Sequence, residues 1–239
     1  MTDFTDDTFL GGRICARQPL GGFRSGLDAV VVAAAVPAQA NDRILELGAG
    51  AGIASLCLAA RVVNCELVGV EIDPRLVAVA NANAGTNGFD TRVTFVEADV
   101  TALPQNLRIE FDHVFCNPPF HADDQRSPDT ARAMATHGAT LADWIKTGFA
   151  RSRSGGTFTA IVRADRLATV LETTGSEGVT VFPLWPHAGT PAKRVILQVC
   201  RSSRAPFVLL AGMVLHRSDG AYTDQADAVL RGGAALALR

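Results

Sequence analysis

Short apolar strands alternate with helical segments through the middle of the chain, and this alternation restricts the possible folds more than any other feature. The predicted strands lie at residues 43–47, 66–71, 93–97 and 111–116. The predicted helices between them lie at residues 53–63 and 73–87. Strands that alternate with helices of this length form βαβ units, which assemble into a parallel sheet. The sequence therefore predicts an α/β fold built on a mostly parallel sheet.

The flanking segments extend this pattern without indicating a second domain. Later elements are predicted as helices at 141–151, 166–177 and 223–230 and as strands at 156–162, 179–185 and 195–200. Before the first strand, Asp28 leads into the apolar run 29–36, which we expect to form a helix over the sheet edge or a ligand. A length of 239 residues fits one domain. We predict a single domain, 1–239, with an N-terminal cap segment, 1–40, and a core, 41–239.

Composition and charge argue against several classes of protein. The formal net charge is −2 and the pI is about 6.2, so no overall basic field indicates a nucleic-acid partner. No apolar run reaches the roughly 18 residues that a membrane span needs, and the acidic start is unlike a signal peptide. Five cysteines without a Cys-x-x-Cys pair indicate neither a zinc site nor a disulfide framework. We therefore expect a cytoplasmic protein without a bound metal or a membrane contact.

The strand at 111–116 runs directly into Asn117-Pro118-Pro119-Phe120. Proline cannot donate to a strand ladder and restricts the residue before it, so the strand must end there with Asn117 extended. In open α/β sheets, ligands bind at this carboxyl edge. The Asn117 side-chain oxygen and the Pro118 carbonyl offer two neighbouring acceptors, and Phe120 offers a flat ring. This set suits a planar group that carries an NH2, although Asn-Pro-Pro is also an ordinary turn sequence.

A glycine-rich loop connects the first strand to the helix that follows it. Glycines at this position allow a tight turn and let a ligand approach backbone amides at a helix N-terminus. The spacing is Gly48-x-Gly50-x-Gly52 with Glu46 two residues upstream, which differs from the Gly-x-Gly-x-x-Gly of dinucleotide sites. An acidic residue there would repel a pyrophosphate and suits a ligand with an ammonium group. S-adenosylmethionine carries such a group and a sulfonium cation; a nicotinamide oxidoreductase is the alternative.

Acidic residues follow the next two strands at the same predicted edge. Glu71 ends the second strand about twenty residues after the loop, where a carboxylate accepts hydrogen bonds from ribose hydroxyls. Asp99 and Val100 follow the third strand, where Asp99 would accept a hydrogen bond from an adenine amine. The alternative is that both acids are solvated strand ends. Cys116 precedes Asn117 with no neighbouring base in view, so we interpret it as strand packing and not as a covalent nucleophile.

In this order and spacing, the motifs resemble those of class I S-adenosylmethionine-dependent methyltransferases with an Asn-Pro-Pro-aromatic motif. Within that group the chain is most similar to the tRNA1(Val) (adenine-37-N6)-methyltransferase family. The matching residues are 24–29, 46–52, 71–73, Asp99, 117–120, 219–223 and 230–233. The resemblance implies a Rossmann-like, mostly parallel seven-stranded sheet whose last strands form an antiparallel hairpin, consistent with residues 179–200.

The resemblance also implies which residues act in catalysis and which bind the cofactor. The catalytic residues would be Asn117, Pro118, Pro119 and Phe120. The residues that bind S-adenosylmethionine would be Arg24, Asp28, Glu46, Gly48, Gly50, Gly52, Glu71, Ile72, Asp99, Val100 and Asn117. The implied reaction is methylation of the exocyclic N6 amine of an adenosine in tRNA. Protein-glutamine N5-methylation and rRNA guanine-N2 methylation stay open, as does a catalytically silent module that binds S-adenosylmethionine.

An exocyclic amine or a glutamine amide is a poor nucleophile because its lone pair is delocalised. The Asn117 oxygen and the Pro118 carbonyl could accept the two N–H bonds and turn the lone pair toward the sulfonium methyl. These hydrogen bonds strengthen as the nitrogen gains positive charge, so they favour the transition state over the ground state. Phe120 would stack on the base.

Local basic residues would have to contact RNA, because the net charge provides no general attraction. The candidates lie in the N-terminal segment and near the predicted hairpin: Arg13, Arg17, Arg24, Lys193, Arg194, Arg201 and Arg204. Residues 121–139 are polar and lack periodicity, which indicates a lid, a substrate loop or a disordered segment.

Overall fold

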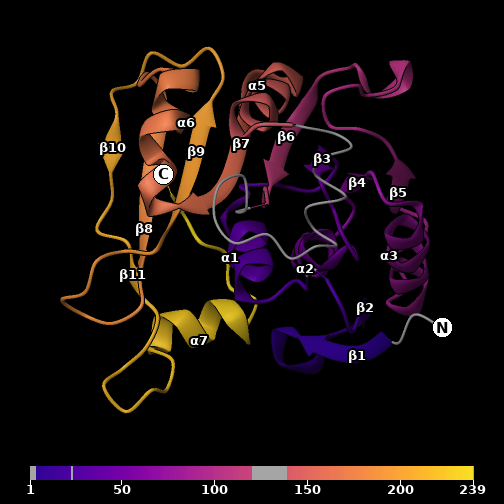
Figure 1. Cartoon of the computed structure of the whole chain (residues 1–239), viewed down its shortest axis with the longest axis horizontal. Coiled ribbons are helices and arrows are strands. Elements are labelled where there is room, and N and C mark those ends of the chain that lie inside the picture. The colour runs from indigo at the N-terminus through magenta and orange to yellow at the C-terminus, as the bar shows by residue number, and fades with distance from the viewer. Residues whose placement is uncertain (1–3, 23, 120–138, 239) are drawn as a thin grey trace.

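The computed structural model describes residues 4–22, 24–119 and 139–238 of the chain. Within them, one large sheet has the strand order β10-β8-β9-β7-β6-β3-β4-β5, with helices on both faces (Figure 1). Its main strands are β3 (Arg43–Leu47), β4 (Glu66–Glu71), β5 (Val93–Glu97), β6 (Phe111–Cys116), β7 (Ser152–Arg163), β8 (Val179–Trp185) and β9 (Arg194–Cys200). Neighbours from β5 to β7 are parallel, whereas β9 is antiparallel to both β7 and β8. The predicted sheet and its antiparallel hairpin are thus confirmed.

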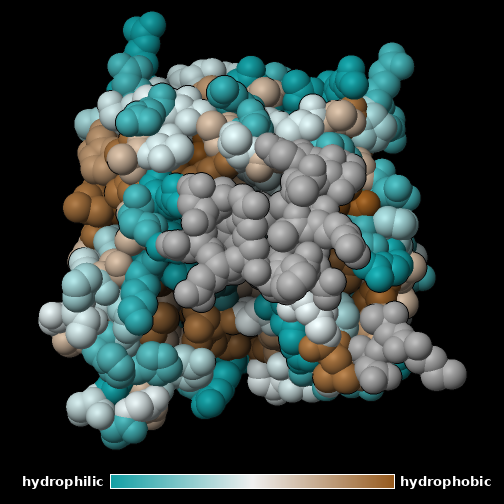
Figure 2. All heavy atoms as spheres, in the orientation of Figure 1, coloured by the Kyte–Doolittle hydropathy of each residue, from teal (hydrophilic) through white to brown (hydrophobic). Residues whose placement is uncertain are grey.

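Two short strands extend the sheet beyond the seven that the sequence predicted. β10 (Val208–Leu209) and β11 (Met213–Val214) both pair in parallel with β8. Gly212 separates them with a φ of +81°, and a Cβ there would lie 2.3 Å from the Pro183 carbonyl oxygen. The sequence has one apolar run at residues 207–215. The structure divides it into two strands at Gly212, where the backbone passes close to β8. Figure 2 shows a hydrophobic area over β10 at the left of the molecule, where Leu209 is 62% exposed.

Helices on the two faces of the sheet bury two apolar cores. One face carries α1 (Leu27–Ala35), α2 (Ile53–Arg61), α3 (Pro74–Thr86) and α7 (Asp224–Leu230). The other face carries α5 (Leu141–Arg151) and α6 (Leu167–Thr174). Successive strand residues point to opposite faces, so Ile44 packs in the first core and Leu45 in the second. None of the helices in the described ranges is long and apolar enough to cross a membrane.

The helices begin and end where the local sequence supplies caps. Asp73 accepts a hydrogen bond from the Arg75 N–H at 2.9 Å at the start of α3. Thr140 and Asp143 form a capping box at the start of α5. α6 stops before its predicted end because Gly175 turns the backbone with a φ of +74°. Local sequence therefore fixes the helix boundaries that position the site.

An N-terminal hairpin stands apart from the large sheet. β1 (Phe4–Phe9) and β2 (Ile14–Pro19) pair antiparallel around a short 3-10 turn, where the sequence predicted only a cap segment. Half-buried and exposed residues alternate along β1, and its centre is polar, so no apolar run marked it as a strand. β2 buries Ile14 and Ala16 against the core of the α1 face.

Two asparagines at the C-terminal end of α3, Asn83 in its last turn and the C-cap residue Asn87, fix the position of this hairpin. Asn83 accepts a hydrogen bond from the Arg17 N–H at 2.8 Å and donates to the Arg17 carbonyl at 3.0 Å. Asn87, one turn later, makes the same pair of bonds with Cys15. Asn83 also donates to the Ala51 carbonyl at 2.9 Å, in the glycine-rich loop. One buried side chain therefore connects the hairpin to that loop.

Candidate active site

The parallel register places the predicted site residues along one edge of the sheet. Leu47 pairs with Cys116 on one side and with Val70 on the other. Glu71 pairs with Glu97 on the next strand. Residues that end or directly follow these strands at the carboxyl edge include Gly48, Glu71, Ala98 and Asn117. The fold thus brings together motifs that are distant in the sequence.

The glycine-rich loop has left-handed backbone angles at all three predicted glycines. The φ angle is +68° at Gly48, +56° at Gly50 and +85° at Gly52. A Cβ on Gly48 would lie 2.3 Å from the ring of Trp144, and one on Gly52 would lie 2.6 Å from Phe95. Around Gly50, no atom of the described residues lies within 4 Å of such a Cβ. The loop needs glycine for its conformation, and its side at Gly50 is open to a ligand.

Trp144 is a neighbour of this loop that sequence reasoning missed. It lies in the first turns of α5, and its ring packs against Gly48 from the α5 face of the sheet. The sequence signal was one aromatic residue early in an amphipathic helix, which is also what core packing produces. The ring limits how far the loop can move toward α5.

Glu71 joins the loop to the start of α3 through three backbone hydrogen bonds. Its Oε2 accepts the Gly50 N–H at 2.8 Å, and its Oε1 accepts the N–H groups of Ile72 at 2.8 Å and Asp73 at 3.0 Å. A carboxylate offers about four acceptor sites, so about one is left for a further donor. Glu71 thereby organises two predicted cofactor segments, and its bond to a ribose hydroxyl stays a prediction.

Glu46 lies behind the loop and is 2% exposed. Its Oε2 accepts hydrogen bonds from the N–H and the hydroxyl of Ser55, in the first turn of α2. Burial raises the pKa of this carboxyl to about 8, although the Ser55 bonds act in the opposite direction. The sequence had assigned Glu46 to an ammonium group of the ligand; the structure shows its bonds to Ser55, and the ligand contact stays a prediction.

Asn117 carries the least satisfied polar atom at this edge. Its side-chain oxygen Oδ1 is buried and has no hydrogen-bond partner among the described residues. A buried acceptor without a partner costs about 1–3 kcal/mol, so such an atom needs a donor from elsewhere. Pro118 is buried and Pro119 exposed, while Phe120 lies outside the described residues. The predicted substrate loop, 121–139, also lies outside them except for its last residue.

Cys116 is fully buried beside Asn117. Burial raises the pKa of its thiol far above the usual value, so the thiol stays protonated. This environment agrees with the interpretation of Cys116 as packing within β6.

The adenine side of the predicted site follows β5. The Asp99 carboxylate accepts hydrogen bonds from the Thr101 N–H and the Thr101 hydroxyl, both at 2.7 Å. Val100 is buried in the core of the α5 face. Asp99 is therefore held at a fixed place at the sheet edge, and its contact with an adenine amine stays a prediction.

Arg24 and Asp28, the predicted N-terminal cofactor residues, are both in ion pairs. Arg24 donates to Asp7 of the hairpin at 2.6 Å. Asp28, in the first turn of α1, accepts from the Arg194 Nε at the start of β9 at 3.0 Å. These two residues are close in the sequence, but Arg24 is bonded to the N-terminal hairpin and Asp28 to the large sheet.

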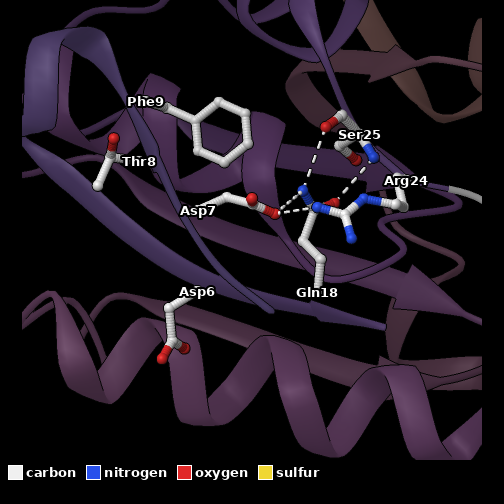
Figure 3. A pocket seen from close by; sticks show the side chains of 7 residues that line it. All are labelled: Asp6, Asp7, Thr8, Phe9, Gln18, Arg24 and Ser25. Carbon is white, nitrogen blue, oxygen red and sulfur yellow. Dashed lines mark hydrogen bonds and ion pairs between the residues drawn. The ribbon is translucent and has the colours of Figure 1, made fainter. Parts of the chain in front are cut away.

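Figure 3 shows a hollow at the hairpin, where Gln18 and Asp7 point toward Arg24 and Ser25. The hollow has a volume of about 460 Å³. Gln18 is 2% exposed; it accepts from the Ser25 N–H at 2.8 Å and donates to the Ser25 carbonyl at 3.2 Å. The hairpin therefore holds the segment that leads into α1.

Comparison with known proteins identifies the class. Residues 27–143 match the methyltransferase small domain family. A tRNA1(Val) (adenine(37)-N6)-methyltransferase of Aeromonas hydrophila is 27% identical over 206 residues, covering 84% of this chain and 85% of the relative. One of the same name from Bacteroides thetaiotaomicron is 32% identical over 155 residues, 64% of each chain.

Solved structures share the fold. A predicted O-methyltransferase from Agrobacterium tumefaciens superposes with a TM-score of 0.74 at 27% identity, covering 89% of this chain and 99% of its own. A 16S rRNA N2 G1207 methyltransferase from Thermus thermophilus has a TM-score of 0.59 at 20% identity, covering 83% of this chain and 50% of its own. At 20% identity, the match to the rRNA methyltransferase shows a shared fold only.

Sequence matches and fold agree with the arrangement of the sheet edge, so the chain is a class I methyltransferase that uses S-adenosylmethionine. Among these enzymes it resembles the tRNA1(Val) (adenine(37)-N6)-methyltransferases. The described residues fit this cofactor, because the loop is open at Gly50 and Glu71 has acceptor capacity left. In the same described part of the chain, no cluster of His, Cys, Asp and Glu could hold a metal ion.

Proposed function

We propose that this enzyme methylates the exocyclic N6 amine of an adenosine in tRNA. The observation that carries the proposal is the buried Asn117 Oδ1, an acceptor without a partner in the described residues at the carboxyl end of β6. An amine N–H is the donor that such an atom lacks. We further propose that the enzyme works in the cytoplasm as a single domain, with residues 1–40 as its cap.

The chain's own residues would activate the amine by accepting its protons in hydrogen bonds. S-adenosylmethionine supplies the electrophilic methyl group on its sulfonium sulfur. The Asn117 Oδ1 and the Pro118 carbonyl would each accept one N–H, so that the nitrogen lone pair is no longer directed into the ring. Both bonds strengthen as positive charge develops on the nitrogen, and Asn117 is preorganised because its strand ends at two prolines. Phe120 would stack on the base.

The names of the relatives support the choice of tRNA as substrate, and the alignments with these relatives cover most of the chain. The basic residues predicted to contact phosphate differ in whether they are already bonded within the protein. Five of the seven predicted phosphate contacts are bonded within the protein: Arg13 to the Gly232 carbonyl, Arg17 to Asp6, Arg24 to Asp7, Arg194 to Asp28 and Arg201 to Glu110. Lys193 and Arg204 are exposed. RNA would therefore have to exchange with several existing ion pairs or use other cations.

Other cations are present beside the predicted adenine end. Arg108, Lys146 and Arg151 line a hollow of about 320 Å³ next to Val100. Among the described residues, none of these three forms a salt bridge with a carboxylate. Such a group of basic side chains suits the phosphate backbone of a nucleic acid.

The test is to incubate the protein with methyl-labelled S-adenosylmethionine and separate tRNA, rRNA and protein fractions. Mass spectrometry of the digested products then identifies the methylated group. N6-methyladenosine in tRNA is the expected product. Label as N5-methylglutamine or N2-methylguanosine would contradict the proposed substrate while preserving the amine chemistry. Cofactor binding without label in any fraction would indicate a catalytically silent module.

A further inference from the structure

Three aromatic rings and a guanidinium lie in a row in the C-terminal part of the chain, which we call the stack; within it the His187–His216 contact is tilted. The ring centroids of His187 and His216 are 5.7 Å apart with an interplanar angle of 42°. His216 stacks on Tyr222 at 4.9 Å and 24°. The guanidinium carbon of Arg231 lies 5.5 Å from the centroid of the Tyr222 ring. His187 is the exposed end of this stack, whereas His216 and Tyr222 are half-buried.

Backbone hydrogen bonds hold the stack before any ligand arrives. Thr190 donates its hydroxyl to the His187 carbonyl at 2.7 Å and its N–H to the same oxygen at 3.2 Å, which closes a tight turn. The His216 N–H donates to the Pro186 carbonyl at 3.0 Å. His216 also pairs with Tyr222 in a β-bridge. The rings are therefore preorganised, which lowers the entropy cost of binding a flat group.

The far end of the stack is equally fixed. Arg231 donates to Asp227 at 2.9 Å, one helical turn earlier in α7. The remaining carboxylates of this segment are also engaged: Asp219 accepts the Ala221 N–H, and Asp224 pairs with Arg217. The two arginines offset the charges of Asp224 and Asp227, which reduces the repulsion that a phosphate would meet at these two carboxylates. Tyr222 and Arg231 thereby give the motif at 219–223 and 230–233 a structural role.

Strand register places the exposed end of the stack at the edge that carries Asn117. β6 is parallel to β7, and Arg163 at the end of β7 pairs with Arg194 at the start of β9. Arg194 in turn pairs with Leu184, near the end of β8. The 186–193 loop, which contains His187, therefore lies at the carboxyl edge of β7.

We propose that His187 is a stacking platform for an unpaired RNA base next to the target adenosine. This inference rests on the proposed function. Proteins recognise single-stranded RNA by stacking splayed bases on aromatic side chains and arginine planes, and the structure presents both in one ladder. Exposed Lys193 in the same loop supplies a cation for the adjoining phosphate. The platform would bind RNA from one side while Asn117 receives the target amine at the same sheet edge.

The test compares His187→Ala with His187→Phe, because phenylalanine keeps a stacking face but not the imidazole. The probe is an unmodified tRNA transcript that the wild-type enzyme methylates. His187→Ala should weaken RNA binding and raise KM about 5- to 150-fold with kcat changed little, since a stacked base contributes about 1–3 kcal/mol. His187→Phe should stay within about threefold of wild type. Glu172→Ala, an exposed change on α6, is the matched control.

Affinity for S-adenosylhomocysteine and the melting temperature should be the same in all variants, because His187 is exposed. RNA affinity of His187→Ala equal to that of wild type would overturn the inference. A Phe variant as weak as the Ala variant would also overturn it, since the ring face would then not be what binds. If the wild-type enzyme methylates no RNA, the proposed function itself fails, and that result is separate from the comparison between variants.

Discussion

The parallel sheet and the N-terminal hairpin contribute to the same site but are held by different interactions. The sheet strands are buried between two apolar cores, and the register of β3, β4 and β6 sets where the glycine loop and Asn117 emerge. The hairpin also buries apolar residues, but Asn83 and Asn87 set its position against α3, and Gln18 bonds to Ser25 in the segment before α1. The part of the site on the sheet, called the sheet half, is therefore positioned by the packing of the core. The part next to the N-terminal hairpin, called the hairpin half, is positioned by a few polar hydrogen bonds.

The largest expected effect is on the sheet half, from Gly48→Ala. The substitution places a Cβ against the Trp144 ring and imposes a left-handed conformation on a residue with a side chain. We expect a loss of about 3–5 kcal/mol in the free energy of unfolding and a loss of cofactor binding. Denaturant melts and calorimetry with S-adenosylhomocysteine measure both.

The matched control for that change is Gly50→Ala, where the same kind of backbone strain applies but space is open among the described residues. It should cost only about 1 kcal/mol. Equal losses at the two positions would show that Trp144 does not pack on the loop as described.

The second effect is a pH dependence that originates in Glu46. Burial raises the pKa of the Glu46 carboxyl to about 8 in the folded protein from its ordinary value of 4.5, so the folded state binds the proton more tightly than the unfolded state. Its contribution is fully favourable below about pH 4.5 and is lost as the pH rises through about 8. Glu46→Gln stays neutral and keeps an acceptor for Ser55.

Urea melts from pH 5 to pH 9 should show wild-type stability falling by about 2–4 kcal/mol relative to Glu46→Gln over that range. Parallel curves for the two proteins would contradict the burial of an ionisable group behind the loop.

The third effect concerns the hairpin half and Asn83→Ala. The change leaves the Arg17 N–H and carbonyl and the Ala51 carbonyl without their partner, at a cost of about 1–3 kcal/mol. Hydrogen exchange should accelerate at residues 14–19 before the large sheet opens. Asn81→Ala is the control, because Asn81 bonds to Phe95 of β5 and not to the hairpin. The same hydrogen-exchange pattern in both variants would contradict the claim that the hairpin half and the sheet half are held by different interactions.

The comparison also explains what the sequence could predict. Periodicity and turn residues located Val93–Glu97, Phe111–Cys116, Leu141–Arg151 and Val179–Trp185 with the bounds that the structure has. These elements depend on neighbouring residues, so local pattern is sufficient to find them. β1 was missed because its centre is polar, and its partner strand is held by Asn83 and Asn87, which are far away in the sequence.

The site shows the same division. The glycines of the loop, the acids at the strand ends and Asn117 could be predicted because each belongs to a short, recognisable sequence motif. Trp144 above Gly48 and Ser55 beneath Glu46 were missed, because such contacts depend on which helix faces which loop. A serine in the first turn of α2 and two asparagines four residues apart at the C-terminal end of α3 were the available signals. Four-residue spacing places Asn83 and Asn87 on one helix face, but it does not name the partner.

The central claim is that Asn117 activates an amine, and single-turnover methyl transfer to tRNA by Asn117→Ala tests it most directly. Cys116→Ala, which changes the buried neighbour, is the control and should transfer methyl at close to the wild-type rate. For Asn117→Ala we predict a rate lower by about 100- to 1,000-fold, with affinity for S-adenosylhomocysteine within about threefold of wild type. Transfer by Asn117→Ala at the wild-type rate would contradict the account.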